Sequence, residues 1–153
     1  MATYQTTYGG APARGLMGQI ASEEKCNKIS RTVEDAAGVK FGYPVERGSG
    51  DHGVVALATA ADFVGIAVLN PAVPPSSDNP DAYPENFTGA FMTMGTMYVA
   101  VNGAVSAGDP VYWDVADGQY TATATDNLAI DGAVFEQSAT SAGDIVEISL
   151  KLR

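Results

Sequence analysis

The most suggestive chemical motif is a glycine-rich stretch at residues 48–53, GSGDHG. Its spacing matches the G-x-G-x-x-G pattern in which backbone amides at the start of a helix cradle a dinucleotide phosphate. However, the VVALAT that follows is typical of a strand, and Asp51 would repel a phosphate. Ser49, Asp51 and His52 share one short loop, whereas a catalytic triad needs a base held by a buried orienting group. The sequence therefore predicts a hairpin turn here.

Metal-binding chemistry is not expected either. Asp78, Asp81 and Glu85 could offer oxygens to calcium, but they lack the glycine and the register of a calcium loop. The chain has one cysteine, Cys26, and one histidine, His52, which excludes cysteine-rich and multi-histidine sites. We predict no catalytic residue, no cofactor and no metal site, and a protein that is not an enzyme.

The elements around these residues are expected to be strands. The chain has 153 residues, the size of one domain, and 15 Val against 6 Leu, which favours β-structure. Short apolar runs bounded by Gly, Pro and Asp predict strands at 39–45, 54–59, 63–69, 91–101, 110–113, 119–122, 133–136 and 144–152. The predicted fold is all-β, a small jelly-roll-like β-barrel or sandwich with an extended N-terminal arm.

An internal sequence repeat indicates two related β units. Shifting the sequence by 66 positions superposes Gly42-x-Pro44-Val45 on Gly108-x-Pro110-Val111, with further matches downstream. The units run from residue 39 to 69 and from 105 to 135. In the second unit Val111, Trp113 and Val115 share one strand face, and this uniformly apolar row is predicted to be core.

Two segments are predicted to bind other proteins. Residues 1–22 contain several glycines and no clear periodicity, so we expect an extended arm that precedes a single β domain at 23–153. Residues 70–86 hold five of the eight prolines and read as a projecting loop. An arm that folds back on its own domain is the alternative. The predicted interface residues are Tyr4, Tyr8, Arg14, Leu16, Met17, Pro74, Pro75, Tyr83 and Phe87.

The charge and the apolar runs of the sequence limit the classes of partner that this protein could bind. The net charge of −10 argues against nucleic acid, which needs Lys and Arg on its phosphates. No apolar run reaches the roughly 18 residues of a membrane span, and the absence of an apolar signal core predicts synthesis in a cytoplasm. Residues 1–47 carry a net +1, whereas residues 48–150 hold thirteen acids and no Lys or Arg. The two ends could dock differently, or the acidity only keeps the domain soluble.

Four sequence segments resemble those of a known family: FGYPVERGS (41–49), TAADFVGIAVL (59–69), VNGAVSAGDPVYWD (101–114) and DGAVFEQSATSAGDIVEISL (131–150). In this order they resemble the structural cement, or capsid decoration, proteins of tailed bacteriophages, in which "G-x-P-V", "F-x-G-I-A", "A-G-D-P-V" and "A-G-D-x-V-x-I-x-L" strands recur. The resemblance covers residues 39–150, and the first 38 residues and the proline-rich loop carry no such signature.

The resemblance implies a non-enzymatic β-barrel protein on the exterior of the phage capsid. Such a protein, made in the host bacterial cytoplasm, would bind the assembled head, cement neighbouring major capsid protein subunits and form a homo-oligomer, a dimer or trimer. A head-fibre or carbohydrate-binding β domain is the alternative. It would expose clustered aromatics, for which Tyr112, Trp113 and Tyr120 are the candidates.

Overall fold

The computed structural model describes residues 15–59, 62–75 and 79–151, and these form strands and turns without a helix. The all-β prediction is confirmed. No helix in the described part of the chain is long and apolar enough to cross a membrane. The strands are β1 (Asn27–Val33), β2 (Val39–Lys40), β3 (Pro44–Arg47), β4 (Gly53–Ala56), β5 (Phe63–Ala67), β6 (Ala82–Tyr83), β7 (Thr88–Ala100), β8 (Pro110–Asp114), β9 (Gln119–Thr121), β10 (Leu128–Phe135) and β11 (Ile145–Lys151).

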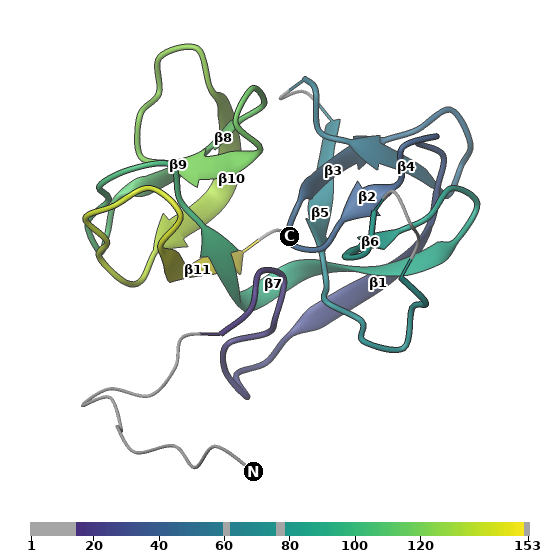
Figure 1. Ribbon diagram of the computed structural model, residues 1–153, viewed down its shortest axis with the longest axis horizontal. Helices are drawn as coiled ribbons and strands as arrows, with labels where there is room; N and C mark the ends of the chain where they lie inside the picture. Colours follow the sequence, from purple (N-terminus) through teal and green to yellow (C-terminus); the bar gives the residue numbers. More distant parts are fainter. Residues whose placement is uncertain (1–14, 60–61, 76–78, 152–153) are drawn as a thin grey trace, which may run out of the picture.

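The first barrel is a closed ring of five strands. Its order is β1-β4-β3-β5-β7, and β7 pairs with β1 again, so the ring has no free edge. It lies on the right in Figure 1, with the small β2–β6 sheet across one opening. Of the predicted barrel and sandwich, the structure has the barrel.

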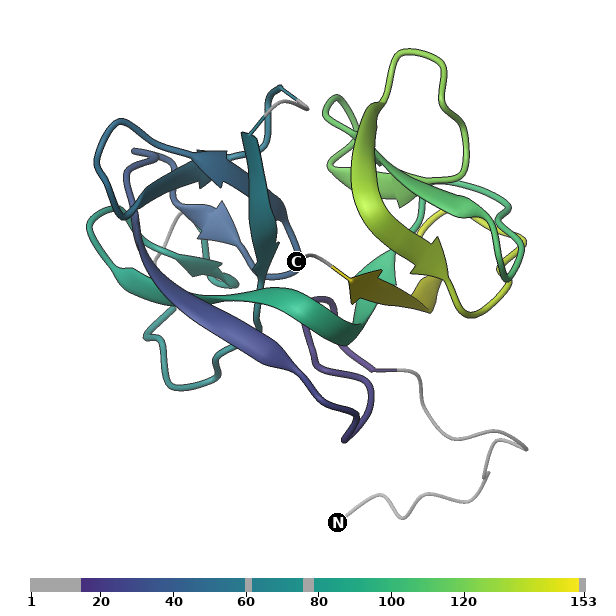
Figure 2. The same ribbon diagram turned by 180° about the vertical axis from the view of Figure 1, so that it is seen from behind.

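The second barrel shares β7 with the first. Its strands run β7-β11-β10-β8-β9, and a parallel bridge between Val101, just after β7, and Tyr120 of β9 closes the ring. The 13-residue strand β7 crosses from one barrel to the other, as Figures 1 and 2 show from both sides. It crosses near Gly95, whose φ of 135° suits a bend that residues with a Cβ rarely adopt.

The predicted internal repeat is confirmed, because β3-β4-β5 and β8-β9-β10 have the same arrangement. The Gly42 N–H donates to the Ala67 carbonyl at 2.8 Å, and the Gly108 N–H donates to the Phe135 carbonyl at 2.7 Å. Both glycines have positive φ, 79° and 94°. Thus the matched glycines mark the same turn before β3 and β8, where a left-handed backbone requires glycine.

Two hydrophobic clusters fill the barrels. One lies inside the first barrel, and the other fills the second barrel and extends across the junction to Ile66 and Met92. Val111 and Trp113 are buried at 2% and 3% exposure, as predicted. Val115 is 53% exposed, so its predicted core position is wrong. The reason is that β8 ends at Asp114 and Val115 lies in the turn that follows, where strand alternation no longer applies.

The strand β1 lies outside every predicted strand, and the predicted arm is shorter than expected. Residues 16–22 run along β7, where the Gly18 N–H donates to the Tyr98 carbonyl at 2.8 Å and the Ala21 N–H donates to the Thr96 carbonyl at 3.0 Å. Ile20 forms a bridge with Met97. The predicted boundary at residue 22 is therefore wrong: residues 16–22 belong to the body, and residues 1–14 of the arm lie outside the described residues.

Candidate functional site

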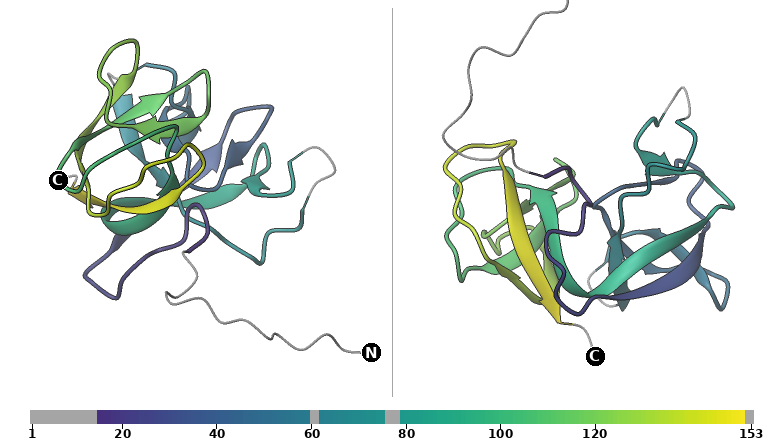
Figure 3. Two further views of the ribbon diagram at one scale, coloured as in Figure 1. Left: turned by 60° about the vertical axis from the view of Figure 1, so that its left-hand side comes forward. Right: turned by 90° about the horizontal axis from the view of Figure 1, so that it is seen from below.

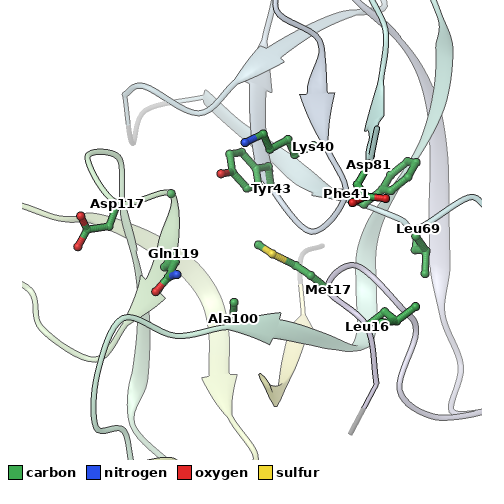
Figure 4. Close-up of a pocket in the computed structure, with 11 residues that line it drawn as sticks. Leu16, Met17, Lys40, Phe41, Tyr43, Leu69, Asp81, Ala100, Asp117 and Gln119 are labelled. Carbon is green, nitrogen blue, oxygen red and sulfur yellow. The ribbon is translucent and has the colours of Figure 1, made fainter. Parts of the chain in front are cut away.

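A cleft of about 470 Å³ lies between the two barrels (Figure 4). The first barrel contributes one wall and the turn before β9 contributes the other, while Ala100 at the end of β7 lies between them. Met17 points into the middle of the cleft, opposite Tyr43. The lining residues are Leu16, Met17, Lys40, Phe41, Tyr43, Leu69, Asp81, Ala100, Asp117, Gly118 and Gln119.

This lining suits binding and not catalysis. Its apolar side chains would accept an apolar or aromatic group of a partner, and Lys40, Asp81 and Asp117 are exposed charges at its margin. Among the described residues, no three His, Cys, Asp or Glu side chains are grouped so that they could hold a metal ion.

Aromatic contacts fix the two barrels against each other. The ring of Tyr43, from the first barrel, packs edge-on against Trp113 of the second at 4.8 Å between centroids. Trp113 in turn packs against Tyr120 at 4.9 Å, and the Tyr120 hydroxyl donates to the Gly42 carbonyl at 2.7 Å. Burial, and to a lesser degree the nearby Tyr43, raises the pKa of Tyr120 well above 10.0, so its phenol stays neutral and can donate this bond.

The buried aromatics remove the platform that a carbohydrate-binding domain would need. Trp113 and Tyr120 are core residues, and Tyr112 is half-buried. A glycan stacks on exposed aromatic faces, and none of the three candidates is fully exposed. The sequence pattern that suggested this alternative is explained by the packing of the second barrel.

The predicted arm residues have different environments. Leu16 is 64% exposed at the margin of the cleft, whereas Met17 is half-buried and packs against the second core cluster. Gly15 lies against the ring of Tyr98, so closely that a Cβ would clash with it. Tyr4, Tyr8 and Arg14 lie outside the described residues. The described part of the chain thus begins beside the cleft.

The predicted projecting loop is partly folded into the first barrel. Pro74 and Pro75 are exposed as expected, and Pro74 lines a second, smaller hollow of about 370 Å³ with Ala36 and Pro84. Tyr83 is completely buried, pairs in β6, and donates its hydroxyl to the Val68 carbonyl at 2.8 Å.

The prediction of a surface role for Tyr83 is wrong, because its ring plugs the first barrel. Phe87 is half-buried and stacks on that ring at 5.6 Å between centroids. It therefore supports the plug and presents only part of its ring to a partner. The prolines around Tyr83 gave the segment a loop-like composition and masked this core residue.

The glycine-rich motif holds a carboxylate of the protein itself. Glu34, just after β1, accepts hydrogen bonds from the Ser49 N–H at 2.6 Å, the Ser49 hydroxyl at 2.9 Å and the Gly50 N–H at 2.9 Å. These bonds lower the pKa of Glu34 below 4.5. A Cβ at Gly48 or Gly53 would collide with this carboxylate, which explains the glycines. The predicted hairpin turn is confirmed: β3 and β4 pair antiparallel across it.

Sequence reasoning missed the cleft itself. Its residues come from several separate stretches of chain, and nothing in the spacing of Lys40, Tyr43 and Asp117 links them. The internal repeat was the available signal, because two barrels in one chain must meet at a junction. That signal predicts a junction without identifying the side chains in it.

Comparisons with known proteins agree with the fold. A chain in the capsid of Myoviridae phage XM1 superposes with a TM-score of 0.71 at 20% sequence identity, over 97% of this chain and 97% of that one. No curated protein matches the sequence. The family model "Structural cement protein (E217 gp24/Pam3 gp6)" matches residues 4–151. Because that match spans nearly the whole chain, the protein belongs to the phage structural cement protein family, whose role in the virion capsid is structural and not enzymatic.

Proposed function

We propose that this protein binds the outside of the assembled phage head and cements neighbouring major capsid protein subunits. The observation that carries the proposal is the pair of barrels built on one continuous strand, β7. One chain thereby presents two binding units side by side. A body that contacts two subunits at once gains affinity from both contacts without needing a strong contact at either.

The junction between the barrels supports this role. A clamp between two subunits must resist being pulled apart, and a flexible linker would not transmit force. Here Tyr43, Trp113 and Tyr120 pack in series, and the Tyr120 hydroxyl bonds to the Gly42 carbonyl of the other barrel. These contacts and the shared strand hold the two units in one orientation.

The N-terminal arm supplies a further proposed contact. Residues 1–14 precede Gly15, which lies beside the cleft and the exposed Leu16. At about 3.3–3.6 Å per residue, such an arm reaches about 45–50 Å, enough to contact a neighbouring subunit. Tyr4 and Tyr8 would fill pockets there and Arg14 would bind an acidic or carbonyl-rich site. We further propose a dimer or trimer on the head, and synthesis in the host cytoplasm.

A decoration experiment tests the proposed function. DNA-filled heads assembled without this protein are mixed with the purified protein and sedimented, and occupancy is measured on the pelleted heads. Because the heads are already closed, the protein can reach only their outer surface. We expect saturable binding and release of DNA at a higher temperature than from undecorated heads. Absence of co-sedimentation, or saturation without added heat resistance, would contradict the proposal.

Deletion of residues 2–14 tests the arm separately. We expect the thermal midpoint to change by less than about 2 °C, since the bonds of residues 16–22 to β7 are kept. Occupancy on heads should fall sharply. The double variant Tyr4→Ala, Tyr8→Ala is the matched full-length version and should lose most of the same affinity. A truncated protein that melts earlier but decorates heads fully would show that the arm belongs to the body.

A further inference from the structure

Part of the positive charge of the described residues gathers at one place. Six of the chain's eight Lys and Arg lie in the described part, since Arg14 and Arg153 fall outside it. Five of these six are exposed, and three of the five, Lys25, Lys28 and Lys151, come together from opposite ends of the sequence. We call these three residues the basic strip.

Strand β7 brings the basic strip together. Asn27 at the start of β1 and Lys151 at the end of β11 are both Cα partners of Met94. A residue in a strand has one such neighbour at each edge, so β1 and β11 lie on either side of β7 here. Figure 3, right, views the molecule from below, the side on which both the end of β11 and the turn that precedes β1 can be followed.

A hollow of about 380 Å³ lies between the lysines. Lys25 and Lys151 both line it, and Met94, Gly95 and Thr96 of β7 contribute to the same lining. Gly95 has no side chain to fill it. Glu24 is the acidic residue in the lining, so the hollow is mixed in charge with an excess of one ammonium group.

Among the described residues, the three lysines of the basic strip are unpaired positive charges on an otherwise acidic protein. No ion pair engages Lys25, Lys28 or Lys151 within the described ranges, so their charges are available to a partner. Elsewhere the chain is acidic, with no Lys or Arg between residues 48 and 150 and a net charge of −10 overall. A protein of this charge approaches an acidic partner against repulsion unless it presents its basic part.

We propose that the basic strip is the surface that faces the capsid and that it binds carboxylates of the major capsid protein. This inference rests on the proposed function and adds the binding face and the chemistry of its partner. The hollow would receive an Asp- or Glu-bearing loop, with Lys25 and Lys151 on either side of the carboxylate and the methionine beneath its apolar stem. Lys28 of β1 is the Cα partner of Met92 of β7 and extends the basic strip along the same edge.

Matched charge reversals test this face. The strip variant is Lys151→Glu, and the control is Arg47→Glu, which changes the net charge equally at an exposed position outside both the strip and the cleft. Binding to heads is measured at about 50 and 200 mM NaCl, because the attraction between exposed charges is screened by salt. We expect the strip variant to bind about tenfold or more weakly at low salt and to lose most of the salt dependence of the wild type. The control should stay within about twofold of the wild type.

Each outcome distinguishes the two proposals. Wild-type protein that does not bind heads overturns the proposed function and the role of the strip with it. If the wild type binds and the strip variant binds equally, with the same salt dependence, the strip is not the docking face and the proposed function stands. Equal weakening of the control also overturns the strip, since total charge would then be responsible. Melting curves of both variants, which change only exposed side chains, verify folding.

Discussion

The first barrel is closed by a ladder in which β1 pairs with β7 at six positions and with β4 at two. The second barrel is closed at one bridge, between Val101 and Tyr120. Both contain the same β3-β4-β5 or β8-β9-β10 unit, so the difference lies in what completes each ring. The second barrel has no counterpart of β1 to itself and uses the far half of β7 in that place.

This difference assigns different tasks to the two barrels. The first barrel is completed by its own strands and has its own plug, Tyr83. The second barrel relies on Tyr120, which closes the ring and also bonds to Gly42 of the first barrel. Loss of packing near Tyr120 should therefore weaken both the closure of the second barrel and the junction, whereas changes at the surface of either barrel should have small effects.

The largest expected effect comes from Trp113→Ala. The side chain is buried between Tyr43 and Tyr120, so its removal leaves a cavity at the junction and should cost about 3–5 kcal/mol of unfolding free energy. Urea unfolding followed by circular dichroism measures it, since Trp113 is the only tryptophan. Val115→Ala, at an exposed position in the turn after β8, should change stability by less than about 0.5 kcal/mol. Equal stability of both variants would place the tryptophan outside the core.

Substitution of the equivalent glycines of the two barrels should give the next largest loss of stability. Alanine at Gly42 or Gly108 forces a left-handed backbone on a residue with a Cβ, at about 1–2 kcal/mol. A Cβ at Gly108 meets open space, but at Gly42 it meets Met17 and lies 2.9 Å from the Gly18 nitrogen. Gly42→Ala should therefore cost about 2–4 kcal/mol in total.

Hydrogen exchange identifies which residues lose protection in the Gly42→Ala variant. The variant should speed exchange of the Gly18 and Ala21 amides, which hold residues 16–22 on β7, while Gly108→Ala should leave them unchanged. Equal costs and equal exchange in the two variants would mean that the N-terminal segment does not press on this turn.

Much of the fold could be predicted from local pattern. The Val-rich runs, the turn glycines and the repeat at a shift of 66 positions can all be found in the sequence alone. They correspond to observed strands and turns. The exceptions are the two-residue β6, which lies in the predicted projecting loop, and β1, NKISRTV, in which polar residues and a cation separate Ile29 from Val33. The strand character of β1 comes from pairing with β7, and no local pattern contains that partner.

The candidate site was less predictable for the same reason. Tyr83 and Pro74 share a segment of loop-like composition, yet one is core and the other surface, because only the tertiary fold decides which side chain meets the barrel opening. Likewise Lys25 and Lys151 become neighbours through β7 alone. Composition predicted that charge was unevenly distributed along the chain but could not give its place on the surface.

The two plugging tyrosines allow a smaller, pH-dependent comparison. Tyr83→Phe removes a bond within the first barrel and Tyr120→Phe removes the bond between barrels, and each leaves a carbonyl unpaired at about 1–2 kcal/mol. Burial raises the pKa of both phenols, and that of Tyr120 far more. A raised folded-state pKa means that the stabilisation is complete below about pH 10 and is lost as pH rises above it. Thermal midpoints across that range should fall less steeply for Tyr120→Phe than for wild type or Tyr83→Phe.

The smallest effect concerns the two equivalent hairpins. The β3–β4 turn is held by Glu34, which lies outside the hairpin. The β8–β9 turn is held by a carboxylate of the hairpin itself, since Asp114 accepts bonds from the Ala116 and Asp117 amides at 2.9 and 3.2 Å, and also from the Asn102 side chain at 3.0 Å. The pKa of Glu34 is lowered by its bonds to Ser49 and Gly50. Its contribution is therefore present above the ordinary carboxyl pKa and is lost as pH falls through the lowered value.

Acidification should thus release the β3–β4 turn without unfolding the barrel. We expect the Gly50 amide to exchange faster, relative to its intrinsic rate, as pH falls below about 4, while the Gly118 amide, which donates to the backbone carbonyl of Asp114, serves as the internal reference. Glu34→Gln keeps one acceptor oxygen but has no carboxyl to titrate, so its Gly50 amide should be less protected at neutral pH and should lack the acid step. An acid step that persists in Glu34→Gln would show that a group other than Glu34 holds the turn at neutral pH. The contrast between the two hairpins would then not rest on this carboxylate.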